Sequence, residues 1–121
     1  MDKNVRHPNR YWMIFSCYRK KENIETNLQY LEWIIQDCQK RNIKVILLTT
    51  PTFHTYYDVL NQDQVTEREE ICNNLVKKYS NVTFLDWLKH EQFNEDDFFD
   101  ADHLNEYGAE KLTKMLDEYI K

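Results

Sequence analysis

The residues of this chain whose types and spacing could do chemistry are Asp100 and His103. They stand three positions apart in an acidic and aromatic stretch, just before a helical pattern that begins near Glu106. An aspartate at this spacing can accept a hydrogen bond from the Nδ1 proton of the histidine, which leaves Nε2 free to act as a base. The spacing therefore predicts a pair that could activate a hydroxyl nucleophile.

The ten residues that begin at this pair read D-A-D-H-L-N-E-Y-G-A, from Asp100 to Ala109. This block resembles the last conserved block of SGNH/GDSL hydrolases, especially a bacterial branch with D-x-D-H-L-N-x-x-G-A before a terminal helix. The stretch from Ile43 to Pro51, which ends in T-T-P, and the spacing through Val82 to Asp86 are similar to that branch as well. The resemblance covers roughly residues 24–120.

The resemblance implies that Asp100 orients His103 and that His103 activates a serine. The family includes esterases, lipases and carbohydrate O-acyltransferase or deacetylase relatives. It also implies a partial flavodoxin-like fold, a three-layer α/β/α sandwich with a small parallel sheet.

The family's serine, however, follows Gly-Asp, and neither Ser16 nor Ser80 does so. The single glycine, Gly108, belongs to the last block, so the family's oxyanion-hole glycine has no match, and its asparagine block has none either. Because such donors supply much of the rate, we expect the isolated chain to be an inefficient esterase.

The residues alone also allow plainer interpretations of this stretch. Asp100 and His103 could be turn and cap residues, since loop aspartates often bond to their own backbone. We interpret Asp102 as a turn or surface residue. Together with Asp96 and Asp97 these side chains could gather a hard cation, but the EF-hand pattern fails because its glycine and glutamate do not align. We therefore expect no metal.

Hydrophobic periodicity along the chain predicts three helices and three strands. The helices carry an apolar stripe at helical spacing, and the strands are short apolar, aromatic or β-branched runs. The predicted N-caps are Asn23, Thr66 and Asn105. In chain order, the predicted elements are a strand at 11–17, a helix at 24–41, a strand at 43–49, a helix at 66–79, a strand at 82–86 and a helix at 106–120.

This alternation favours an α/β layer with a parallel sheet, because parallel strands need a helical crossover between them. Ligands of such sheets lie beyond the carboxyl ends of the strands. Thr50, His54 and Tyr56 follow the strand at 43–49, so we predict that they bind substrate, with the small acyl esters of the family as the possible class. An aromatic loop that packs on the sheet edge is the plainer alternative.

Composition excludes several classes of function. The chain has 121 residues and a net charge of −5, and we interpret its only compact basic run, Arg19 to Lys21, as a solvated connection from strand to helix. We therefore expect no nucleic-acid partner. One glycine is too few for a phosphate-cradling loop, so we expect no nucleotide cofactor. The chain shows neither a signal peptide nor a membrane-length apolar run, which favours the cytoplasm. Cys38 and Cys72 fall on apolar helical stripes, and buried free thiols fit a reducing compartment.

We expect residues 1–10 to form a flexible arm and residues 11–121 a single domain. A sheet with so few strands leaves open edges, and open edges recruit partners. The chain should therefore associate with itself, preferably as a homodimer through its aromatic N-terminal segment, or bind a partner that completes the sheet. A module that serves protein interaction without catalysis is the alternative to the hydrolase lineage.

Overall fold

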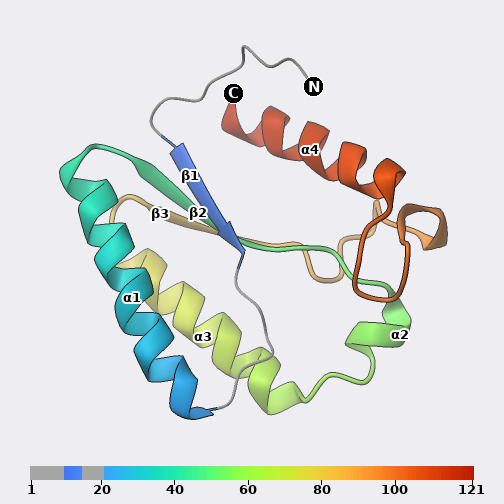
Figure 1. Cartoon of the computed structure of the whole chain (residues 1–121), viewed down its shortest axis with the longest axis horizontal. Helices are drawn as coiled ribbons and strands as arrows, with labels where there is room; N and C mark the ends of the chain where they lie inside the picture. The colour runs from blue at the N-terminus through green and yellow to red at the C-terminus, as the bar shows by residue number, and fades with distance from the viewer. Residues whose placement is uncertain (1–9, 15–20) are drawn as a thin grey trace. The chain divides into compact units, whose positions relative to one another are not determined.

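The computed structural model describes residues 10–14 and 21–121, with side chains from residue 24 onward. Helices and strands alternate along the described chain (Figure 1). In chain order, the elements are β1 (Arg10–Ile14), α1 (Lys21–Lys40), β2 (Lys44–Thr49), α2 (His54–Tyr57), α3 (Gln62–Lys78), β3 (Val82–Asp86), the 3-10 helix η1 (Glu95–Asp97) and α4 (Glu106–Ile120).

The described strands form one sheet in the order β1-β2-β3. β1 pairs with β2 in parallel, from the Arg10–Lys44 pair to the Ile14–Leu48 pair. Helix α1 makes the crossover between these two strands, as parallel pairing requires. The parallel sheet predicted from the alternation of helices and strands is confirmed.

Backbone hydrogen bonds at the two ends of β2 fix its register against β3. The Val45 N–H donates to the Asn81 carbonyl at 2.8 Å, and the Trp87 N–H donates to the Thr49 carbonyl at 3.1 Å. Residue numbers rise together along the two strands, so this pair also runs parallel. The segments that follow β2 and β3 therefore leave the sheet at the same edge.

The chain divides into two compact units, each built from two stretches of sequence. One unit holds residues 10–14, 21–48 and 62–85 of the described chain, and the other holds residues 49–61 and 86–121. The first unit contains α1, α3 and most of the strands, and the second contains α2, η1 and α4. All the residues predicted to act in chemistry belong to the second unit.

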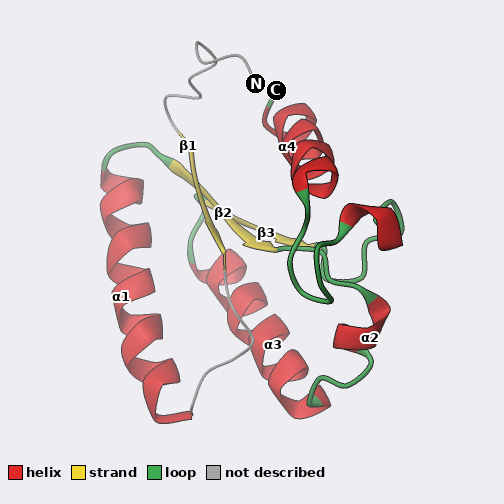
Figure 2. Ribbon diagram, turned by 45° about the vertical axis from the view of Figure 1, so that its right-hand side comes forward, coloured by secondary structure: helices red, strands yellow, loops and turns green. Residues whose placement is uncertain are grey.

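The hydrophobic core of the first unit lies between the sheet and two helices. Figures 1 and 2 show α1 and α3 side by side on the same face of the sheet. Alternate residues of β2 point toward these helices, as the pleat of a strand requires. The buried residues of this core are Leu31, Ile35, Cys38, Ile43, Val45, Leu47, Cys72, Leu75, Tyr79 and Val82.

Polar contacts tie the ends of the core elements together. The Glu32 carboxylate accepts hydrogen bonds from the Lys78 ammonium at 2.6 Å and from the Tyr79 hydroxyl at 2.8 Å. The bond from Lys78, followed by that from Tyr79, lowers the pKa of Glu32. The Asn81 amide donates to the Ile43 carbonyl at 3.1 Å, which holds the start of β3 beside the start of β2.

Several sequence predictions are confirmed residue by residue. β3 and α4 begin and end where the pattern placed them, and the Asn105 side chain caps α4 as predicted. Asn42 has a φ of 56°, and this left-handed residue ends α1, as an asparagine is well suited to do. Cys38 and Cys72 are buried free thiols. β1 covers the described part of the strand predicted at 11–17, whose last three residues lie outside the described chain.

Two predicted helix starts are wrong. α1 begins at Lys21, so Asn23 lies inside the helix rather than at its cap. α3 begins at Gln62, so Thr66 lies in its second turn and the predicted capping box does not mark its start. Asp63 stands in the first turn of α3, where a negative charge is favourable, and the polar residues before Thr66 are compatible with a helix. The short α2 also occupies part of a stretch predicted as an irregular connection.

Together these observations confirm the α/β class with a small parallel sheet. Among the helices of the described chain, none has the length and apolar character that crossing a membrane would require.

Two neighbouring isoleucines of α1 test the core directly. Ile35 is completely buried, whereas the Ile34 residue is 43% exposed. We expect Ile35→Ala to lower the free energy of unfolding by about 2–5 kcal/mol, because it leaves a cavity. The matched control Ile34→Ala should cost at most about 1 kcal/mol. Urea denaturation measures both, and equal costs would contradict this core.

Candidate functional site

A narrow antiparallel loop of residues 97–105 joins η1 to α4. At its base, the Asn105 N–H donates to the Asp97 carbonyl at 2.9 Å. One step further along, Phe98 and Leu104 form an antiparallel bridge. The two arms of the loop are therefore held together from the base upward, and the tip carries the residues singled out in the sequence.

The tip is a turn closed by one aspartate side chain. Asp100 Oδ1 accepts the backbone N–H groups of Asp102 at 3.1 Å and of His103 at 2.8 Å. The Phe99 N–H donates to the His103 carbonyl at 2.8 Å. An aspartate that bonds its own backbone two and three residues on is a common way to build such a turn. The plainer interpretation of Asp100 as a turn residue therefore describes its two contacts with backbone N–H groups.

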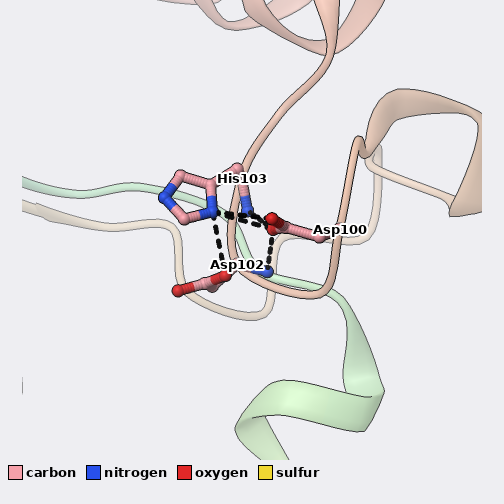
Figure 3. A group of neighbouring side chains, drawn as sticks. All are labelled: Asp100, Asp102 and His103. Carbon is pink, nitrogen blue, oxygen red and sulfur yellow. Dashed lines mark hydrogen bonds and ion pairs between the residues drawn. The ribbon is translucent and has the colours of Figure 1, made fainter.

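The same carboxylate also holds the imidazole ring of His103. Nδ1 of His103 lies 2.8 Å from Asp100 Oδ1 and 3.1 Å from Oδ2 (Figure 3). Asp102 Oδ1 lies 3.0 Å from the same ring nitrogen. The sequence interpretation of Asp102 as a turn or surface residue missed this second contact. Its place directly before His103 is the signal that could have indicated it.

The two carboxylates change the proton affinity of the site. The hydrogen bond that His103 donates to Asp100, followed by the negative charges of Asp100 and Asp102, raises the pKa of His103 above its ordinary value. The hydrogen bond with His103, followed by the backbone N–H of Asp102, lowers the pKa of Asp100. The His103 side chain is 69% exposed and that of Asp100 is 47% exposed. Water screens such a pair, so its value lies in orientation more than in stability.

With Nδ1 engaged, the other ring nitrogen determines what the site can do. Figure 3 shows it pointing away from both carboxylates. A neutral ring whose Nδ1 proton is donated to Asp100 has an unshared electron pair on Nε2, which can accept a proton from a hydroxyl or water. This is the geometry of a general base held by a carboxylate.

A second segment of the same unit lies against this loop. The Phe53 N–H donates to the Ala101 carbonyl at 2.8 Å, and the rings of Phe53 and Phe98 lie 5.8 Å apart between centroids. The Thr52 N–H donates to the Leu88 carbonyl at 3.0 Å. The stretch after β2 is thus fixed beside the loop that carries the Asp100–His103 pair.

The three residues predicted to bind substrate belong to this second segment. Thr50 and Tyr56 are half-buried, and His54 is exposed. The His54 ring packs on the Phe53 ring at 4.3 Å, and its Nδ1 lies 3.6 Å from an Asp58 carboxylate oxygen. The structure therefore brings Asp100 and His103 into direct contact, and it places Thr50, His54 and Tyr56 on the adjoining segment.

The same cluster offers atoms that a metal ion could use. One ligand atom from each of Asp100, Asp102 and His103 lies within 4.8 Å of the others. All three residues are exposed, and exposed acidic groups are common without an ion. The Asp100 carboxylate is already held by the imidazole and by two backbone N–H groups, and the Asp102 carboxylate contacts the same imidazole.

Comparison with known proteins places the chain in a family. A family model matches residues 18–121, so the chain belongs to the family that this model describes. This match does not indicate an activity. No curated protein matches the chain.

A solved structure shares the fold. It is a protein from Streptococcus pneumonia described, provisionally, as a platelet activating factor, and the two structures superpose with a TM-score of 0.67. The match covers 93% of this chain and 60% of that protein, with 18% sequence identity. At this identity the likeness shows the fold alone, and the chain spans about 60% of that protein's length.

The two carboxylates at Nδ1 make unequal contributions that a titration can separate. We expect Asp100→Asn to lower the pKa of His103 more than Asp102→Asn does, because the hydrogen bond that His103 donates to Asp100 is the largest cause of the raised pKa. The unsubstituted ring should titrate above about 6.5, the value of an unperturbed histidine. NMR titration of the imidazole protons measures all three values. A larger effect of Asp102→Asn would show that the wrong carboxylate has been assigned.

Proposed function

We propose that this chain is the part of an SGNH/GDSL-type hydrolase-like domain that supplies the acid–base pair for ester hydrolysis or acyl transfer. The observation that carries the proposal is the 2.8 Å contact between Asp100 Oδ1 and His103 Nδ1, at the tip of a loop before the last helix. The block D-A-D-H-L-N-E-Y-G-A supports it independently.

In the proposed reaction, His103 is the general base. Its Nε2 accepts the proton of a serine hydroxyl while the serine oxygen bonds to the carbonyl carbon of an ester. The same proton then passes to the leaving alkoxide as the carbon–oxygen bond breaks, and water repeats the sequence to release the acid. Asp100 keeps the ring oriented and stabilises its protonated form. Thr50, His54 and Tyr56 lie on the segment where an acyl ester would bind.

The nucleophile is the missing partner in this proposal. Ser16 and Ser80 do not follow Gly-Asp, and Ser16 lies outside the described residues. We infer that a polypeptide bearing the Gly-Asp-Ser strand and the oxyanion-hole donors completes the site, and that the chain alone has little activity. The solved structure with the same fold is longer than this chain, which is compatible with that division. The buried thiols of Cys38 and Cys72 support a reducing compartment such as the cytoplasm.

Hydrolysis of p-nitrophenyl acetate tests the proposal in the chain combined with a polypeptide that carries the Gly-Asp-Ser strand. We expect His103→Ala to reduce kcat/KM by about 10²–10⁴-fold, the usual contribution of a positioned base. Because the base must be unprotonated and its pKa is raised, activity should increase with pH through an inflection above about 6.5. Asp100→Asn should move that inflection to lower pH.

Lys114→Ala is the matched control, since Lys114 forms an exposed ion pair with Glu110 on α4. It should leave both the rate and the pH profile unchanged. A rate that survives His103→Ala would contradict the proposal. The chain on its own should also resist stoichiometric labelling by a fluorophosphonate, and labelling of Ser16 would show that it carries its own nucleophile.

A second candidate function, protein association without catalysis, is favoured by the surface of α1. Tyr30, Trp33 and Ile34 are 53%, 54% and 43% exposed. The first two rings pack edge to face at 5.2 Å, so they form a preorganised aromatic surface. Exposed aromatic groups of this kind are common at sites of association. Self-association through this helix and the edge of the sheet at β1 would also provide the partner expected from the sequence.

Sedimentation velocity at micromolar concentration tests this candidate. We expect a homodimer that shifts toward monomer when Tyr30 and Trp33 are both replaced by serine, because their apolar area would then be lost from the interface. Replacing Tyr107 and Tyr119 of α4, which are 65% and 44% exposed, gives a matched pair of aromatic controls. A monomeric unsubstituted chain would rule out self-association.

A further inference from the structure

The base of the loop of residues 97–105 holds an ion pair between the buried Asp97 and the half-buried Lys111, which the proposed reaction does not use. Asp97 is only 4% exposed. Its carboxylate accepts the Lys111 ammonium at 2.6 Å and the Asn94 N–H at 2.9 Å, both at Oδ2. Burial raises the pKa of Asp97, but the bonds from Lys111 and Asn94 outweigh it and leave the pKa lowered. Asp97 is therefore held as a carboxylate.

Lys111 reaches this carboxylate from the second turn of α4. Its ammonium also donates to the Gln92 carbonyl at 2.8 Å and lies 5.3 Å from the centre of the Phe93 ring. One side chain thus connects α4 to the segment before η1 and to η1 itself. Breaking one half of such a pair is costly, because it leaves a charge buried without its partner.

Gly108 brings the first turn of α4 against the same residue. A β-carbon at this position would overlap with the Asp97 carbonyl oxygen and would lie 2.9 Å from a Leu104 methyl carbon. The same carbonyl accepts the Asn105 N–H that closes the loop base. Asn105 in turn accepts the N–H groups of Tyr107 and Gly108, so the helix cap and the loop base share their atoms.

We propose that Asp97, Lys111 and Gly108 form a base clamp whose role is to position the imidazole of His103 against Asp100. This inference rests on the proposed function of the Asp100–His103 pair, because a positioning residue needs a group to position. The inference is tested by the pKa of the His103 ring in the absence of substrate. The test can therefore fail or succeed independently of any esterase activity.

Hydrogen bonds connect the base clamp to the tip of the loop. The contacts that orient His103 are made by exposed groups, and water competes with each of them. A turn of this kind keeps one geometry when the two arms below it are fixed. The arms are fixed at the Asn105–Asp97 bond, which lies inside the base clamp. If the clamp is released, the arms can separate and the ring can leave the carboxylate.

Lys111→Met is the informative single substitution, because its two possible effects on His103 have opposite signs. Removing a nearby positive charge would by itself raise the pKa of the ring. Loss of positioning would instead lower that pKa toward about 6.5, the value of a free histidine. We expect the fall, measured by NMR titration of the His103 ring, together with loss of the hydrogen-bonded Nδ1 proton signal. Lys114→Met, which removes an exposed lysine from the same helix, should change neither.

A double variant keeps the test decisive if the single one does not fold. Asp97→Asn with Lys111→Met leaves the net charge unchanged and leaves no buried charge without its partner. We expect the same fall in the His103 pKa in this double variant. The single substitution Lys111→Arg preserves the cation, and in that variant we expect His103 to keep the parental pKa. A folded double variant with the parental pKa would overturn the proposal, as would a rise in the pKa of Lys111→Met.

Discussion

The Asp100 carboxylate is the group on which the local structure depends most. One of its oxygens accepts two successive backbone N–H groups, which closes the turn, and the same oxygen faces the Nδ1 of His103. The same carboxylate oxygen therefore closes the turn and orients the His103 ring. Backbone donors already fix this carboxylate when the chain folds. It therefore loses no further side-chain freedom when it holds the imidazole during the reaction.

The fold explains why this turn lies beside a second segment rather than alone in solvent. Strands β2 and β3 are parallel neighbours, so the stretches that follow them leave the sheet at the same edge. Within the second unit these stretches are joined by backbone bonds from Trp87 to Thr49, from Thr52 to Leu88 and from Phe53 to Ala101. The position of Thr50, His54 and Tyr56 follows from this topology more than from their own side-chain chemistry.

The sequence predicted secondary structure best where neighbouring residues alone determine it. The strand run Val82–Asp86 and the Asn105 cap are signals of this kind, and both are confirmed. The starts of α1 and α3 were mispredicted, because Asn23 and Thr66 are good caps that the longer helices include. The Asp100–His103 contact followed from spacing and family resemblance. The Asp97–Lys111 pair did not, because its partners stand 14 residues apart and only the packed loop brings them together.

His103 must present an unprotonated Nε2 to act as the proposed base, since a base needs that electron pair. The nitrogen-15 chemical shifts of the two ring nitrogens, recorded above the ring's pKa, report this directly. The structure predicts the tautomer with the proton on Nδ1, donated to Asp100. A ring protonated mainly on Nε2 would mean that the carboxylate does not hold it, and would contradict the proposed role of the pair.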